Sequence, residues 1–176
     1  MTALLASVDR FDARAERLAD HLRGKRPADL LFYAASALGD HGIAWAIVAA
    51  MQVGLDHNRA HAALRLVVAL LIESLLVNIG IKSLFRRTRP VFAGDRPLRL
   101  RQPRSSSFPS GHSTSAFMAL ILASDGQIRF FSLYLAIAIV IAYSRIHVRI
   151  HHASDVAGGV ILGLLFGLLI RTLFPL

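Results

Sequence analysis

Apolar residues fill five long stretches of this chain, each set off by polar residues. The stretches cover residues 28–55, 61–84, 110–124, 130–143 and 156–173. A helix that crosses a bilayer needs about 20 apolar residues. We therefore predict five membrane-spanning helices, of which the shorter ones end in polar residues buried inside the bundle. Gly39-Asp40-His41-Gly42 interrupts the first stretch, which is either one span with a polar step or a short interfacial helix followed by a span.

The first 26 residues show a different pattern. Apolar residues recur there at steps of three and four, with arginines and acids between them: Leu4, Leu5, Val8, Phe11, Ala15, Leu18 and Leu22. This spacing is typical of an amphipathic helix that lies in the membrane interface, although a soluble docking helix would have the same spacing. Gly24-Lys25-Arg26-Pro27 ends the helix. Charged residues precede any long apolar run, which does not fit the order of a signal peptide, so we expect the segment to be retained.

Composition supports a membrane protein. Of 176 residues, 55% are hydrophobic, and the mean hydropathy is +0.53, which is too apolar for an ordinary soluble fold. We predict a single membrane-integral domain over residues 1–176, an all-α polytopic helix bundle. The chain has no cysteine, which excludes disulfides and thiolate chemistry. In so apolar a chain, the net charge of +9 favours an anionic lipid or an anionic substrate over nucleic acid.

A basic loop separates the second and third predicted spans, within residues 82–112. Seven arginines face one acid, Asp95: Arg86, Arg87, Arg89, Arg96, Arg99, Arg101 and Arg104. Four prolines keep the loop from being helical throughout. The loop either anchors the chain on the cytoplasmic side of the membrane or binds a polyanionic substrate, and the two roles are compatible.

Three polar clusters lie at the ends of predicted spans. They are Lys82-x6-Arg89-Pro90, Pro109-Ser110-Gly111-His112 and Ser144-Arg145-x5-His151-x3-Asp155. Because successive spans run in opposite directions, the end of the second span, the start of the third and the end of the fourth lie at the same membrane face. The sequence therefore predicts that the three clusters converge.

In this order and spacing, the clusters resemble the tripartite signature of the type 2 phosphatidic-acid phosphatase family, whose wider superfamily includes vanadium haloperoxidases. The similarity covers residues 82–155 and the flanking spans. A lone Pro-Ser-Gly-His would be a weak signal, whereas the joint pattern is specific. The resemblance implies a lipid phosphate phosphatase that needs no metal or other cofactor, with the bilayer and a lipid phosphate substrate as its partners.

The resemblance also implies a role for each histidine. His151 would be the nucleophile that forms a phosphohistidine, and Asp155 would accept a hydrogen bond from its other ring nitrogen. His112 would protonate the leaving lipid alkoxide and then activate water. Counting from Arg145 selects His151 rather than its neighbour His152, which breaks both spacings.

The remaining motif residues suit phosphate binding. Lys82, Arg89 and Arg145 would neutralise the phosphoryl oxygens, because transfer of a phosphoryl group depends on charge stabilisation. Ser110 and Gly111 would open a helix whose free amides hold another phosphate oxygen.

Other interpretations stay open at this stage. His147, His151 and Asp155 fall at i, i+4 and i+8, and on one continuous helix they could bind a metal for a metal-dependent hydrolase. An anionic-lipid transporter or flippase could use the same basic loop, and a non-enzymatic scaffold needs neither histidine. Inside the apolar stretches, Asp40, Glu73 and Asn78 are either functional residues or satisfied packing contacts.

The charge distribution predicts the orientation. With five spans, the N-terminus and the three clusters share one face, which collects most of the lysines and arginines. The positive-inside rule places that face in the cytoplasm of a plasma (inner) membrane protein. The expected substrates are lipid phosphates of the inner leaflet, such as phosphatidylglycerol phosphate, phosphatidic acid and polyprenyl phosphates or phosphosugars.

Overall fold

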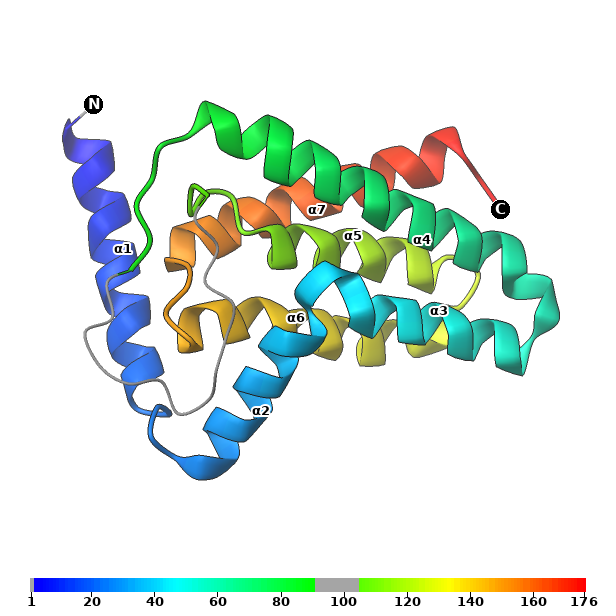
Figure 1. The fold of residues 1–176 in the computed structure, drawn as a ribbon, viewed down its shortest axis with the longest axis horizontal. Helices are drawn as coiled ribbons and strands as arrows, with labels where there is room; N and C mark the ends of the chain where they lie inside the picture. Colours follow the sequence, from blue (N-terminus) through cyan, green and yellow to red (C-terminus); the bar gives the residue numbers. More distant parts are fainter. Residues whose placement is uncertain (1, 91–104) are drawn as a thin grey trace.

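The computed structural model describes residues 2–90 and 105–176, which form a helix bundle (Figure 1). Its α-helices are α1 (Thr2–Asp20), α2 (Arg26–Leu38), α3 (Ile43–Leu55), α4 (Ala60–Leu75), α5 (Gly111–Ser124), α6 (Phe131–His147) and α7 (Ala153–Leu173). A π-helical turn (Leu76–Gly80) and a 3-10 turn (Ile81–Leu84) extend α4. The predicted loop charges at Asp95, Arg96, Arg99, Arg101 and Arg104 lie outside the described residues.

The all-α membrane bundle is confirmed. In the described part of the chain, three segments are long and apolar enough to cross a membrane: His57–Leu84, Ile128–His147 and Ala153–Leu173. A bent pair, Arg26–Leu38 and Asp40–Leu55, would make a fourth.

The helix that falls short is α5. Its 14 residues extend only about 21 Å at 1.5 Å per residue, against a hydrocarbon core of about 30 Å. Most of its side chains are buried, and it contacts α4, α6 and α7. Helix α5 nevertheless runs from the cavity, where Gly111 and His112 lie, to the opposite end of the bundle, where Asp125 pairs with Arg65 and Arg171.

Glycines bring α7 close against α5. A Cβ atom on Gly159 would lie 2.5 Å from the Ser110 carbonyl oxygen, and one on Gly163 would overlap the Thr114 carbonyl oxygen. The Gly159-x3-Gly163-x3-Gly167 pattern therefore permits close packing of the two helices. This contact joins the helix that begins at Gly111 to the helix that carries Asp155.

The polar step in the first apolar stretch is a break between two helices. A 3-10 turn at Asp40–Gly42 separates α2 from α3, and the two helices are bent by 67°. His41 and Gly42 both have left-handed backbones, at φ 53 and φ 72. The break turns Asp40 toward the start of α5, where it contacts His112.

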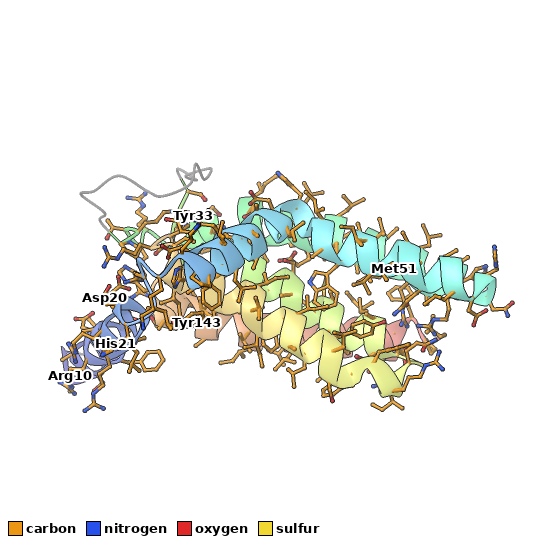
Figure 2. The ribbon with its side chains drawn as sticks, turned by 90° about the horizontal axis from the view of Figure 1, so that it is seen from below. Arg10, Asp20, His21, Tyr33, Met51 and Tyr143 are labelled. Atoms are coloured by element: carbon orange, nitrogen blue, oxygen red, sulfur yellow. The ribbon has the colours of Figure 1, made fainter. Side chains whose placement is uncertain are left out.

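Helix α1 lies across one end of the bundle (Figures 1 and 2). Its polar side holds it to the protein: the Arg23 guanidinium donates to the carbonyl oxygens of Ile146 and His147 at the end of α6. Asp12 accepts hydrogen bonds from the backbone amide and the hydroxyl of Ser154, both at 2.8 Å. Phe11 and Leu18 are exposed on the outside. An outward apolar stripe of this kind suits the predicted interfacial position.

Candidate active site

Residues from all three sequence clusters line one cavity of about 470 Å³. Lys82 comes from the turn after α4, Gly111 and His112 from the start of α5, Arg145 from the end of α6, and His151 from the loop before α7. The predicted convergence at one end of the bundle is therefore present in the structure.

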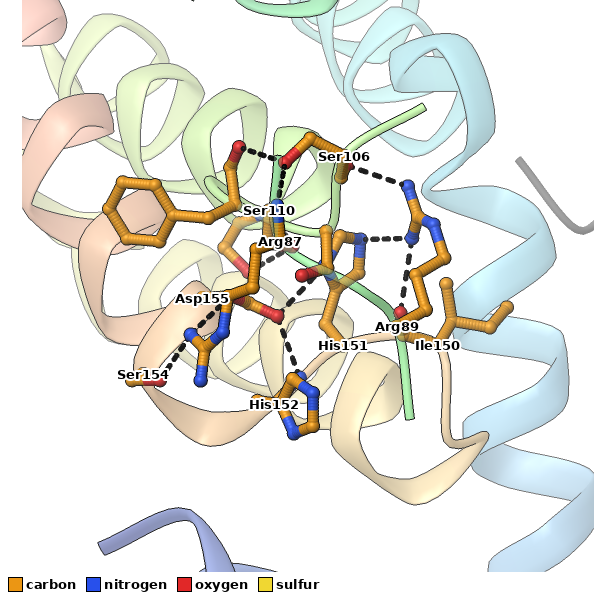
Figure 3. A network of polar contacts seen from close by, with 12 residues as sticks. Arg87, Arg89, Ser106, Ser110, Ile150, His151, His152, Ser154 and Asp155 are labelled. Atoms are coloured by element: carbon orange, nitrogen blue, oxygen red, sulfur yellow. Dashed lines mark hydrogen bonds and ion pairs between the residues drawn. The ribbon is translucent and has the colours of Figure 1, made fainter. Parts of the chain in front are cut away.

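His151 sits in the tight loop between α6 and α7 and is buried, at 2% exposure. Its backbone amide donates to the Arg145 carbonyl oxygen, 3.2 Å away. Figure 3 shows Arg89 reaching the imidazole, with Nη1 3.2 Å from Nε2. A guanidinium can only donate hydrogen bonds, so Nε2 is the acceptor nitrogen and Nδ1 carries the proton. The lone pair of the ring is thus on Nε2, beside the cationic side chain of Arg89.

The other side of the ring faces Asp155. His151 Nδ1 lies 3.6 Å from Asp155 Oδ2, longer than a hydrogen bond. That carboxylate oxygen also accepts a hydrogen bond from the backbone amide of His152, at 2.8 Å, at the first turn of α7. The structure therefore brings the predicted pair together without closing the predicted hydrogen bond.

Arg87 is a site residue that sequence reasoning missed. Its Nη1 donates to Asp155 Oδ1 and to the Ser154 hydroxyl, each at 2.6 Å, and its Nη2 donates to Asp12 Oδ2, also at 2.6 Å (Figure 3). Asp155 is fully buried, so the guanidinium supplies the counter-charge that a buried carboxylate requires. Arg87 was one of seven loop arginines, and nothing in its spacing set it apart.

His112 also has an acidic partner. Its Nε2 lies 3.1 Å from Asp40 Oδ1 and 3.2 Å from the Ser36 carbonyl oxygen. Gly39 makes room for the ring, because a Cβ atom there would lie 2.7 Å from His112 Cδ2. Arg145 is held from the same region by the Ser36 hydroxyl. The only sequence signal for this contact was an ionisable residue inside an apolar stretch.

The start of α5 differs in part from the prediction. Ser110 is the N-cap residue, with its hydroxyl accepting from the Ser113 amide. Its own backbone amide donates to the Asp155 carbonyl oxygen at 3.0 Å, so the expectation that this amide is free for phosphate is wrong. The amide is used to join α5 to α7. Gly111 does line the cavity, and a Cβ atom there would lie 3.6 Å from Lys82 Nζ.

The metal-site alternative fails on backbone geometry. It requires one continuous helix through residues 147–155, but α6 ends at His147 and α7 begins at Ala153, with Arg149 between them at φ 54. His147 Nε2 instead contacts Asp29 Oδ1 at 2.8 Å. Among the described residues, no three His, Cys, Asp or Glu side chains are grouped to hold a metal ion.

Burial sets the protonation of His151. Loss of hydration in the buried loop, together with the nearby guanidinium groups of Arg145 and Arg89 and against the opposing effect of Asp155, lowers the pKa of His151 to about 3. The imidazole is therefore neutral at physiological pH. Burial also lowers the pKa of Arg89, which nevertheless stays charged as an arginine.

Comparison with known proteins gives the same fold. A family model described as the PAP2 superfamily matches residues 62–176, and no curated protein sequence matches the chain. The chain is similar to the crystal structure of the first transmembrane PAP2 type phosphatidylglycerolphosphate phosphatase from Bacillus subtilis, with a TM-score of 0.75 and 23% identity over 98% of this chain and 87% of the other. It is also similar to Aquifex aeolicus LpxE, with a TM-score of 0.71 and 24% identity over 91% of this chain and 94% of that one.

Proposed function

The chain belongs to the PAP2 superfamily of membrane phosphatases, and on this basis we propose that it hydrolyses the phosphomonoester of a membrane lipid through a phosphohistidine on His151. The observation that carries the proposal is the shared cavity, in which Lys82, His112, Arg145 and His151 meet from segments far apart in sequence. Cations, an unprotonated imidazole and a second histidine are the groups that metal-independent phosphoryl transfer needs.

In the first step, His151 Nε2 attacks phosphorus and the bond from phosphorus to the lipid oxygen breaks. Lys82, Arg89 and Arg145 stabilise the negative charge on the phosphoryl oxygens. As Nε2 bonds to phosphorus, the imidazole becomes positive, and the Asp155 carboxylate near Nδ1 stabilises that charge.

His112 takes up a proton when the anionic phosphate binds and gives this proton to the departing lipid alkoxide. A protonated imidazole carries hydrogen on both ring nitrogens. The carboxylate of Asp40 and the Ser36 carbonyl oxygen hold the Nε2 hydrogen, which leaves the Nδ1 hydrogen for transfer. In the second step, neutral His112 takes a proton from water as the water oxygen attacks phosphorus. The bond from phosphorus to nitrogen breaks, its electron pair returns to Nε2, and inorganic phosphate leaves.

The test measures phosphate release by the detergent-purified protein from phosphatidylglycerol phosphate, phosphatidic acid and a polyprenyl phosphate, with and without a chelator. We expect chelator-resistant release that is lost in His151→Ala and His112→Ala and slowed in Asp40→Asn. Chelator-sensitive release, or full release by His151→Ala, would contradict the proposed route. Movement of lipid phosphates between vesicle leaflets without phosphate release would support a flippase instead.

We place the active site at the cytoplasmic face. The site end of the bundle carries the cations of α1 and of the segment after α4, whereas Arg59, Arg65 and Arg171 gather around Asp125 at the end of α5 that is remote from the cavity. The chain has no cysteine, so a single Arg14→Cys substitution on the exposed side of α1 gives one labelling site. We expect a membrane-impermeant maleimide to label it only after lysis, and labelling in intact cells would reverse the orientation.

A further inference from the structure

Glu73 is a buried carboxyl group that the proposed mechanism does not use. It lies in α4, is 4% exposed and lines the active-site cavity. Its Oε1 atom has no hydrogen-bond partner within the described residues. The cavity's other carboxylate, Asp40, is occupied by His112. A buried, unpartnered oxygen is costly, which points to a ligand group that completes it.

A row of polar side chains connects Glu73 to the phosphate-binding end of the cavity. Lys82 Nζ donates to Asn78 Oδ1 at 2.8 Å, and Asn78 Nδ2 donates to the Ser74 hydroxyl at 3.2 Å. All three line the cavity with Glu73, and the other residues between 73 and 82 are apolar or glycine. The π-helical turn at Leu76–Gly80 falls within this row, as such turns often do at functional sites.

The position of Glu73 along the helix matches that of the leaving group. Nine residues separate Glu73 from Lys82, which is roughly 14 Å at 1.5 Å per residue, in the direction of the bilayer core. The lipid tail must also point toward the core, so the part of the substrate between phosphate and tail lies on the Glu73 side of the phosphorus atom. Glu73 thus faces the headgroup that remains on the lipid after hydrolysis.

A carboxyl oxygen accepts a hydrogen bond from a hydroxyl group. The diacylglycerol part of phosphatidic acid has no free hydroxyl until its phosphate is removed, so it would leave Glu73 unpartnered. We propose that Glu73, with Ser74 and Asn78, forms a subsite for a hydroxylated leaving group, the glycerol or sugar headgroup of a lipid phosphate. This inference rests on the proposed phosphatase activity and narrows its substrate class.

The experiment compares kcat/KM for phosphatidylglycerol phosphate, a polyprenyl phosphosugar and phosphatidic acid, the first and last with the same acyl chains. We expect the wild type to prefer at least one hydroxylated substrate, and Glu73→Ala to reduce that preference roughly 10- to 100-fold, the range of a lost hydrogen bond to a charged group. The substrate whose kcat/KM falls most in Glu73→Ala identifies the headgroup as glycerol or sugar. Glu73→Gln keeps an accepting oxygen and should restore part of the preference.

Gln52→Met is the matched control. Gln52 is buried in α3 and bonded to the Ala123 carbonyl oxygen and the Tyr134 hydroxyl, outside the cavity. Its loss should lower the melting temperature without changing the ratio between substrates. Equal losses on all substrates in Glu73→Ala and Glu73→Gln, or a wild type without the preference, would overturn the subsite while His151-dependent hydrolysis stands. Hydrolysis of no lipid phosphate at all would overturn the phosphatase proposal and the subsite with it.

Discussion

Gly159→Ala tests whether the contact between α5 and α7 sets the geometry of the site. The added Cβ atom would lie 2.5 Å from the Ser110 carbonyl oxygen and 2.9 Å from Ser113 Cβ, whereas ordinary contacts begin at 3.4 Å. The helices must therefore separate by about 0.9 Å, the difference between 3.4 and 2.5 Å. Overpacking of this kind costs about 1–3 kcal/mol, and replacing a helical glycine by alanine offsets about 1 kcal/mol of it.

The effect on catalysis should exceed the effect on stability. Ser110 is followed by Gly111 and His112, and α7 carries Asp155, so separation of the two helices moves catalytic groups apart. A misplacement of about 1 Å can cost on the order of 100-fold in rate. We expect kcat for phosphate release to fall on the order of 100-fold, with a loss of melting temperature in detergent corresponding to about 0–2 kcal/mol.

Gly54→Ala provides the matched control, because a Cβ atom there meets nothing within 4 Å. It should leave kcat unchanged and keep or raise the melting temperature, since alanine favours the helix. If Gly159→Ala behaved like Gly54→Ala in both measurements, the claim that this contact positions the site would be refuted.

Two further predictions concern charge. Arg87→Met leaves the buried carboxylates of Asp12 and Asp155 without their guanidinium partner. We expect thermal melting to show about 3 kcal/mol lower stability and phosphate release to show a reduced kcat. The exposed Arg86→Met should change neither, and equal behaviour of the two variants would refute the role of Arg87 as counter-charge. For pH, the pKa of His151 is lowered to about 3 by burial, so the unfolded chain binds the proton more readily. Stability should therefore rise with pH between about 3 and 6.5, and His151→Gln should flatten the melting-temperature profile in that window; an unchanged profile would contradict the cause given.

The sequence reveals those parts of the site that depend on spacing. Lys82, His112, Arg145 and His151 sit at fixed intervals at the ends of apolar stretches, and alternating helix directions are enough to bring them together. Arg87 and Asp12 could not be found in this way, because their contact joins a loop to the N-terminal helix, and only tertiary packing brings the two together. The backbone break at Arg149 could not be predicted either, and the metal-site alternative depended on a continuous helix at this position.

Helix α5 shows the limit of hydropathy. Residues 110–124 are apolar enough to resemble a span, but the pattern does not say whether protein or lipid surrounds them. The bend after Leu38 had a visible cause in Gly39-Asp40-His41-Gly42, and the sequence left its two interpretations open. The structure shows two helices with Asp40 at the bend, an arrangement that fits either interpretation.

The shortness of α5 has a consequence for biogenesis. A helix of about 21 Å that carries Ser113, Thr114 and Ser115 on its buried surface is poorly matched to lipid on its own. During synthesis it must therefore stay near the translocon or the membrane surface until α6 and α7 arrive to enclose it. Nascent chains arrested just after Ser124 should leave this segment open to protease, whereas chains that include α7 should protect it; early protection would show that α5 inserts unaided.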